Sequence, residues 1–391
     1  MCLAQAETNE IYLNRLENNF EKIISEFENY NSRGWSAHAG DREFIRNLFG
    51  NTLGCLEEYE AGIVSGALVG SCGDLAAGFQ NSEILETLPE FYKGELDLTN
   101  KTLIGKCILC LLNRRKNIPA VINLDQTLLF EGTLPLAIIT NLMEYFQKVD
   151  NEQQEHYLVQ FSEAALVNCE LLQEILVLES VLGRYESFDL ALPKLEIPYD
   201  VEQALGTVFL KQTISFIEKY HNDRILFKVV GELVELLYAI NLHGSASMVK
   251  VVEEIESSST GLTENQSCKA FSERTLVKIN SLKPNQSLQN YLCLKLLIDL
   301  FKTNTTNNFF TTSDWEVLLQ IIDRNLTDLG SNSLLRNLFC ELMLNLLESR
   351  NLVVLEGRVE MDFGNLKMSL GVEEGDLVGR RVVEGLEVAG F

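Results

Sequence analysis

The chain has 391 residues, enough for two or three conventional domains or for one continuous stack of helical hairpins. Hydrophobic residues make up 46% and charged residues 23%, which excludes a disordered chain and allows a large core. The 56 acidic and 32 basic residues give a formal net charge of -24, so we expect no nucleic-acid partner and no attraction to anionic lipid.

The first predicted element is an amphipathic helix near the N-terminus. Leu13, Leu16, Phe20, Ile23 and Phe27 follow one another at helical spacing and therefore share one stripe. The helix is short for an independent coiled coil, so we expect it to dock on the rest of the protein.

Small residues characterise the next helical stretch. Gly62, Gly66 and Gly70 are four residues apart and lie on one helix face. In a membrane this spacing would favour helix dimerisation, whereas in a helix surrounded by water it is typical of close backbone packing. No stretch reaches the roughly 18 uninterrupted apolar residues of a membrane span, so we expect packing.

Apolar residues recur at helical spacing through most of the remaining chain. Pro135 falls in a predicted first turn, and a polar segment at 256–267 predicts a loop. The predicted helices span 101–115, 133–149, 152–184, 200–220, 223–243, 246–256, 268–281, 286–303, 312–329 and 332–349.

This succession of helices predicts an all-α fold over residues 1–350, an armadillo/HEAT-like helical repeat stack, or α-solenoid. No consensus aligns at a fixed period, so a compact irregular bundle is the alternative. Residues 351–391 hold seven of the 25 glycines and predict a short non-helical tail. The tail is either a β-hairpin about Gly364 and Asn365 or disordered.

The sequence contains no recognisable catalytic or metal-binding motif. Cys107 and Cys110 form a CxxC pair, which we interpret as helix packing because no second pair exists to complete a zinc site. Phosphate-binding GxxxxGK and nucleophile GxSxG patterns are absent. We expect no enzyme, catalytic residue, cofactor or metal. The four histidines are also dispersed, at His38, His156, His221 and His243.

Several features favour the cytoplasm. The start MCLAQAETNE has no secretory-signal pattern, and nine cysteines without repeated spacing are typical of reduced thiols. The acidic surface either favours basic protein partners or serves only to keep the protein in solution.

The most individual segment is 292–329, LCLKLLIDLFKTNTTNNFFTTSDWEVLLQIIDRNLTDL. A leucine-rich helix ends in Asp-Leu-Phe, and a polar loop, a Phe-Phe pair and a second patterned helix follow. The positions that carry this pattern are Asp299, Leu300, Phe301, Phe309, Phe310, Thr312, Asp314, Val317, Leu318, Ile321, Arg324, Leu326, Asp328 and Leu329.

This segment resembles the leucine-rich domain of the WISH/DIP family, which includes fungal Dip and low-dye-binding proteins and the animal NCK-interacting protein with SH3 domain. The resemblance extends over about 225–350. Ser313 and Trp315 depart from the residues usual at their positions, and no SH3-like segment or PxxP motif is present.

The resemblance implies an actin nucleation-promoting factor. Such a protein binds and activates the actin-related-protein (Arp) complex without a preformed filament and acts on actin indirectly. The resulting linear filaments seed branched networks at endocytic cortical actin patches. The alternative is an armadillo-like scaffold for cortical or trafficking proteins without nucleator activity.

Most motif residues suit structural roles. Asp314, or Ser313 beside it, can cap the following helix, and Phe309 and Phe310 can fill the gap between two helical layers. Arg324 and Asp328 are four apart on a helix and form either a local ion pair or a partner contact. The pattern does not identify other partner-binding residues.

Overall fold

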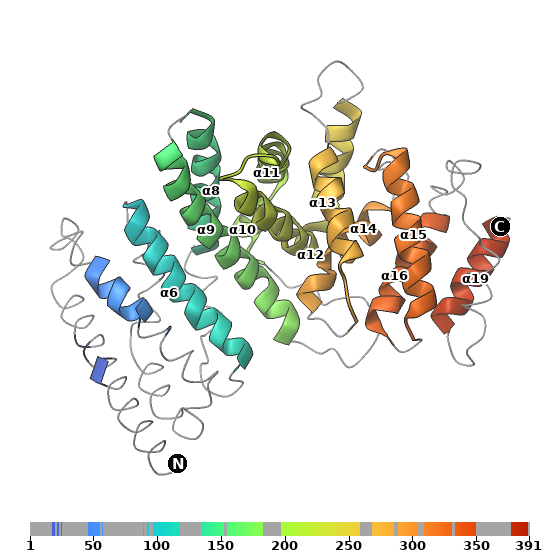
Figure 1. The fold of residues 1–391 in the computed structure, drawn as a ribbon, viewed down its shortest axis with the longest axis horizontal. Coiled ribbons are helices and arrows are strands. Elements are labelled where there is room, and N and C mark those ends of the chain that lie inside the picture. Colours follow the sequence, from blue (N-terminus) through green and yellow to red (C-terminus); the bar gives the residue numbers. More distant parts are fainter. Residues whose placement is uncertain are drawn as a thin grey trace, which may run out of the picture. The chain divides into compact units, whose positions relative to one another are not determined.

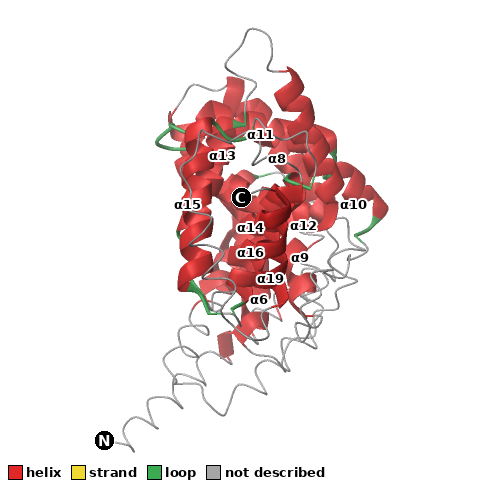
Figure 2. Cartoon of the chain, turned by 90° about the vertical axis from the view of Figure 1, so that its right-hand side faces the viewer, coloured by secondary structure: helices red, strands yellow, loops and turns green. Residues whose placement is uncertain are grey.

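The computed structural model describes residues 18–19, 22, 25, 46–54, 57, 89, 92–93, 97–117, 134–151, 155–182, 197–258, 268–284, 288–302, 309–330, 333–348 and 377–389. All regular secondary structure in these ranges is helical, which confirms the predicted all-α fold (Figures 1 and 2). The chain forms two compact units, Met1–Ile175 and Leu176–Phe391, which are described separately.

The N-terminal unit contains α6 (Leu98–Asn117), α8 (Leu134–Asn151) and most of α9 (Glu155–Leu182). These helices agree with the predicted spans, and Pro135 is the second residue of α8, where its missing N–H costs nothing. A Cβ at Gly105 in α6 would lie 2.6 Å from a methyl group of Val167 in α9, so this close approach requires glycine. The predicted amphipathic stripe at 13–27 and the glycines at 62–70 lie outside the described residues.

The C-terminal unit is built from consecutive helical hairpins. Its elements are α10 (Tyr199–Ala204), α11 (Thr207–Tyr220), α12 (Phe227–Ser258), α13 (Lys269–Asn280), a 3-10 turn (Leu288–Tyr291), α14 (Leu292–Leu300), α15 (Thr312–Asp328), α16 (Leu334–Glu348) and α19 (Leu377–Ala389). In Figure 1 the hairpins follow one another from α11 to α19.

These helices form two layers. Helices α11, α13 and α15 pack side by side in one layer, and α12, α14, α16 and α19 pack in sequence order in the other. Each hairpin, α11 with α12, α13 with α14 and α15 with α16, contributes one helix to each layer. This alternation confirms the predicted helical repeat stack within the C-terminal unit.

The core of the stack is centred on α14. Eight of its nine residues are buried, including five leucines and isoleucines with no exposed surface, among them Leu294, Leu296 and Leu297. Each fully buried side chain of this kind contributes about 2 kcal/mol of hydrophobic stabilisation. The leucine-rich composition is therefore explained by a helix that is enclosed on almost all sides.

Two predicted boundaries in this unit were wrong. The predicted helix 200–220 is interrupted at Gly206, where a Cβ would lie 2.8 Å from the carbonyl oxygen of Gln203. The predicted break between 243 and 246 does not occur, because α12 continues to Ser258. Its buried stripe resumes at Met248 and Val251, and this burial outweighs the cost of about 1 kcal/mol for a glycine within a helix.

The expectation of a non-helical tail is wrong for Leu377–Ala389, which form α19. Two glycines in this helix each cost about 1 kcal/mol relative to alanine. Val382 and Leu386, one helical turn apart, are completely buried, and each contributes about 1.5–3 kcal/mol, so packing outweighs the poor helix propensity. The predicted hairpin about Gly364 lies outside the described residues. The predicted loop at 256–267 is wrong for 256–258, which end α12, and its residues 259–267 lie outside the described ranges.

Candidate functional site

Asp299 of the leucine-rich motif connects two helices of the same layer. It lies in α14 with only 6% of its side chain exposed. Its Oδ2 accepts a hydrogen bond of 2.9 Å from the side-chain amide of Asn241 in α12 and one from Lys295. Lys302 lies 3.4 Å from Oδ1. A buried carboxylate needs such partners, so Asp299 has a structural role in the stack.

The aromatic residues of the motif form one cluster between the layers. Phe309 packs edge-on against Phe271 of α13, with ring centroids 5.7 Å apart. Phe310 packs edge-on against Trp315 of α15 at 5.5 Å, and Trp315 also lies 5.0 Å from Phe301. All five rings are buried, so this cluster joins α13, α14 and α15 and includes the unusual Trp315.

The start of α15 is fixed by a capping box. Thr311 is the N-cap, and its side-chain oxygen accepts from the backbone N–H of Asp314 at 3.3 Å. The Asp314 carboxylate accepts in return from the backbone N–H of Thr311 at 2.9 Å. Asp314 therefore takes part in the cap from the third helical position, while Thr311 is the N-cap itself.

Helix α15 carries the remaining motif residues on its buried and exposed faces. Leu318, Ile321 and Leu326 are buried, whereas Arg324 and Asp328 are exposed. Within the described helix no ion pair joins Arg324 to Asp328, although their spacing favours one. Both charges therefore face solvent beside Val317, which is 44% exposed.

A groove lies between the first half of α12 and α13. It has a volume of about 470 Å³. Phe227 and Val277 on its two sides are 56% and 72% exposed, and the Arg274 guanidinium lies 4.6 Å from the Phe227 ring centroid. Lys278 and Glu235 form an ion pair of 2.7 Å at its edge. The groove thus exposes two large apolar side chains beside charges that are already paired.

The N-terminal end of α13 depends on a residue of α11. The N-cap Cys268 makes no side-chain cap, and the Glu218 carboxylate instead accepts hydrogen bonds of 3.0 Å from the backbone N–H groups of Ala270 and Phe271. Burial raises the pKa of Glu218, and the two hydrogen bonds offset part of this effect. No sequence pattern points to Glu218, Phe227 or Val277, because their roles depend on neighbouring helices and not on local spacing.

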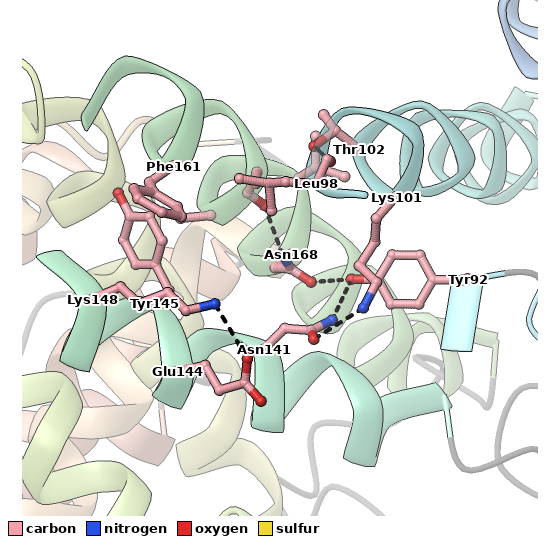
Figure 3. Close-up of a pocket in the computed structure, with 13 residues that line it drawn as sticks. Tyr92, Leu98, Lys101, Thr102, Asn141, Glu144, Tyr145, Lys148, Phe161 and Asn168 are labelled. Atoms are coloured by element: carbon pink, nitrogen blue, oxygen red, sulfur yellow. Dashed lines mark hydrogen bonds and ion pairs between the residues drawn. The ribbon is translucent and has the colours of Figure 1, made fainter. Parts of the chain in front are cut away.

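The N-terminal unit contains a small polar pocket of about 120 Å³ between α6, α8 and α9 (Figure 3). The Tyr92 hydroxyl donates to Asn168 Oδ1 and accepts from the Asn141 amide at 3.2 Å, and Lys101 donates to Asn141 at 3.3 Å. Burial raises the pKa of Tyr92 far above its usual value and keeps the phenol protonated. These polar groups bond to one another, so the pocket is best explained as a structural network.

The histidines and cysteines also have structural surroundings where they are described. Nε2 of His243 donates to the Leu176 carbonyl at 2.7 Å, and Nδ1 of His221 lies 2.8 Å from the Glu218 carbonyl. Cys107 of the CxxC pair is buried and its thiol points to the Phe49 carbonyl. In the described ranges no group of three or more His, Cys, Asp or Glu residues could hold a metal.

The geometry thus defines the class of protein. It is a stack of helical hairpins with buried motif residues and an exposed face on α15. Residues 228–356 match the family model described as "SPIN90/Ldb17, leucine-rich domain". This match covers less than half of the chain and confirms the predicted WISH/DIP resemblance for these residues. The family consists of scaffold- or adaptor-type domains linked in general to actin-related and endocytic function.

The comparison with solved structures adds no argument. A crystal structure titled as an engineered protein matches 94% of this chain and 99% of its own chain, at 12% identity and a TM-score of 0.28. Among the described helices, none has the length and hydropathy needed to cross a membrane.

Proposed function

We propose that this protein is an actin nucleation-promoting factor that binds and activates the Arp complex without a preformed filament. The linear filaments that it generates seed branched networks at cortical actin patches, where it acts in the cytoplasm during endocytosis. The observation that carries this proposal is the leucine-rich domain at residues 228–356, within which the individual motif at 292–329 falls.

Activation of this kind requires binding energy and no bond-breaking chemistry by the activator. A protein that binds the active arrangement of the complex more tightly than the inactive one shifts the population by the ratio of the two affinities. A hundredfold shift requires a difference of about 3 kcal/mol, which a modest set of surface contacts can supply. The exposed face of a helical stack offers such contacts without a catalytic pocket.

The decisive assay combines the purified protein, the Arp complex and actin monomers, with fluorescence-monitored assembly and imaging of single filaments. We expect a dose-dependent increase in new, unbranched filaments without added filament seeds. If circular dichroism shows a folded protein and assembly is not accelerated, the alternative of an armadillo-like scaffold without nucleator activity is favoured.

The exposed charges of α15 are the contact residues that we propose to test first. Arg324 and Asp328 belong to the motif, face solvent and are not paired with each other. We expect the double substitution Arg324→Ala and Asp328→Ala to reduce nucleation by about tenfold, as expected for the loss of roughly 1.4 kcal/mol of interface energy. The matched control removes two exposed opposite charges elsewhere, by Glu202→Ala and Lys228→Ala.

Unfolding midpoints of both double variants should equal that of the unmodified protein. Equal nucleation by the two variants would show that the two charges of α15 are not part of the interface.

A fluorescent fusion of the protein in cells should colocalise with cortical actin patches, and diffuse fluorescence would argue against the proposed location.

A further inference from the structure

Helix α19 covers a face of α16 but lies outside the matched domain. The family match ends at residue 356, whereas α19 spans Leu377–Ala389. Figure 1 shows α19 beside α16 at the end of the stack, and α16 is the helix on which α19 packs most extensively. The domain thus carries an additional helix from its own chain on what is otherwise its terminal surface.

The contact between these helices is specific. Val382 and Leu386 of α19 are completely buried, and a Cβ at Gly385 would lie 3.2 Å from Leu347 and 3.7 Å from Leu344 of α16. Two apolar anchors one turn apart, with a small residue immediately before the second, therefore fit this face of α16. A side chain at 385 would require Leu347 to shift by a few tenths of an ångström.

Charge adds a further requirement. Glu341 on α16 has a carboxylate oxygen that is buried and, in the described structure, without a hydrogen-bond partner. Burial raises the pKa of Glu341, and the positive charges of Lys302, Lys295 and, to the smallest extent, Arg381 of α19 offset part of this effect. A docked helix with a basic residue at this position compensates the acidic charge beneath it.

The composition of α19 makes its helix dependent on docking. The sequence LVGRRVVEGLEVA contains two glycines and four valines, all of which disfavour an isolated helix. An isolated helix of this length is marginal in water even with favourable residues. Release from α16 therefore also dissolves the helix and leaves the α16 face open.

We propose that this face of α16 is a docking site for an amphipathic helix of a partner protein. In the free protein α19 occupies this site, and the partner helix displaces it. The partner helix carries two apolar anchors at i and i+4, a small residue at i+3 and a basic residue at i−1, as Val382, Leu386, Gly385 and Arg381 do in α19. This site is separate from the exposed face of α15.

Hydrogen exchange of the unmodified full chain tests whether α19 is exchangeable. Local release predicts that the amides of α19 exchange at least about tenfold faster than those of α16 and do so without global unfolding. Exchange of both helices together, only in the global transition, would identify a permanent structural cap and overturn the proposal.

A peptide experiment tests the site itself. The full chain with Val382→Asp and Leu386→Asp should release α19, and a fluorescent peptide of residues 377–389 should then bind at least about tenfold more tightly than to the unmodified chain, whose tethered helix competes. A peptide with the same two substitutions is the control, and a peptide with Arg381→Glu should bind several-fold more weakly.

Circular dichroism and thermal unfolding establish that the substituted chain is folded before binding is measured by anisotropy. Failure of the 377–389 peptide to bind the folded variant would overturn the proposal. A concentration-dependent dimer that exchanges α19 between copies would also overturn it, because the site would then serve self-association. None of these readouts uses actin, so they are independent of the proposed nucleating activity.

Discussion

Asp299 shows how a charged residue can be required inside a leucine-rich helix. Replacement by alanine would leave the Asn241 amide without its acceptor and Lys295 without its buried counter-ion. We expect Asp299→Ala to lower the free energy of unfolding by about 2–3 kcal/mol, as for loss of hydrogen bonds to a buried charge. Urea unfolding followed by circular dichroism measures this change.

The matched control is Lys302→Ala. Lys302 reaches the same carboxylate at 3.4 Å but is 51% exposed, so its loss should change stability by less than about 1 kcal/mol. Equal effects of the two substitutions would contradict the interpretation that Asp299 is essential because it is buried.

His243 gives the stack a predicted pH dependence. Burial lowers the pKa of this imidazole, so the folded protein favours its neutral form. An unfolded histidine titrates near 6.5. Stability is therefore fully present above about pH 6.5 and falls as the pH decreases below that value, because the unfolded chain binds the proton more readily.

The variant His243→Gln keeps an amide donor for the Leu176 carbonyl but does not titrate. We expect the difference in unfolding free energy between the original protein and this variant to shrink as the pH is lowered from about 7.5 to 5.5. Parallel stability curves over this interval would show that His243 does not contribute to the pH dependence.

Among the helices, α13 depends most clearly on a neighbour for its start. Glu218→Ala removes the acceptor for the backbone N–H groups of Ala270 and Phe271. We expect a loss of about 1–2 kcal/mol in unfolding free energy, the range found for helix caps, and a smaller loss for Glu218→Gln, which keeps one acceptor oxygen.

Glu273→Ala is the control for this substitution, because Glu273 is exposed on α13 and its contact with Lys269 is 4.0 Å long. Chemical denaturation should place this control within about 0.5 kcal/mol of the original protein. If Glu218→Ala has no larger effect than the control, α13 does not need the contact from α11.

Helices with local sequence signals were predicted correctly, whereas helices that depend on packing against other helices were not. Helices α8 and α15 have a strong periodic stripe and local start signals, Pro135 and the Thr311–Asp314 box, so sequence spacing is sufficient. The continuation of α12 and the existence of α19 depend on burial against other helices. Glycine has a low helix propensity, and propensity alone contains no information about the packing partner.

The motif was informative about structure but less so about contacts. Its pattern indicated aromatic packing at Phe309 and Phe310 and a capping role for Asp314, but the N-cap is Thr311, and Asp314 completes the box from the third helical position. Of the two interpretations of Arg324 and Asp328, an ion pair or a partner contact, the ion pair is not seen in the described helix. Exposed groove residues such as Phe227 could not be found, because exposure is a property of the assembled hairpins.

The charge of the whole molecule leads to a prediction about its partners. A net charge of -24 repels phosphate groups over the range of a Debye length, about 8 Å in physiological salt. We therefore expect no retardation of duplex DNA in a gel-shift assay and no flotation with phosphatidylserine vesicles. Neutral vesicles and a basic DNA-binding protein serve as controls, and binding to either anionic target would refute the expectation.

The capping of α13 by Glu218 also bears on how the domain should be isolated. A fragment cut to residues 228–356 would omit this carboxylate together with all of α11, the helix that packs most extensively on α12. Its apolar residues, Phe209 and Ile217 among them, would no longer shield the cut edge, and such a fragment should be prone to aggregation. The matched stretch is thus shorter than the packed hairpin to which it belongs, and an expressed fragment should include α11 with Glu218.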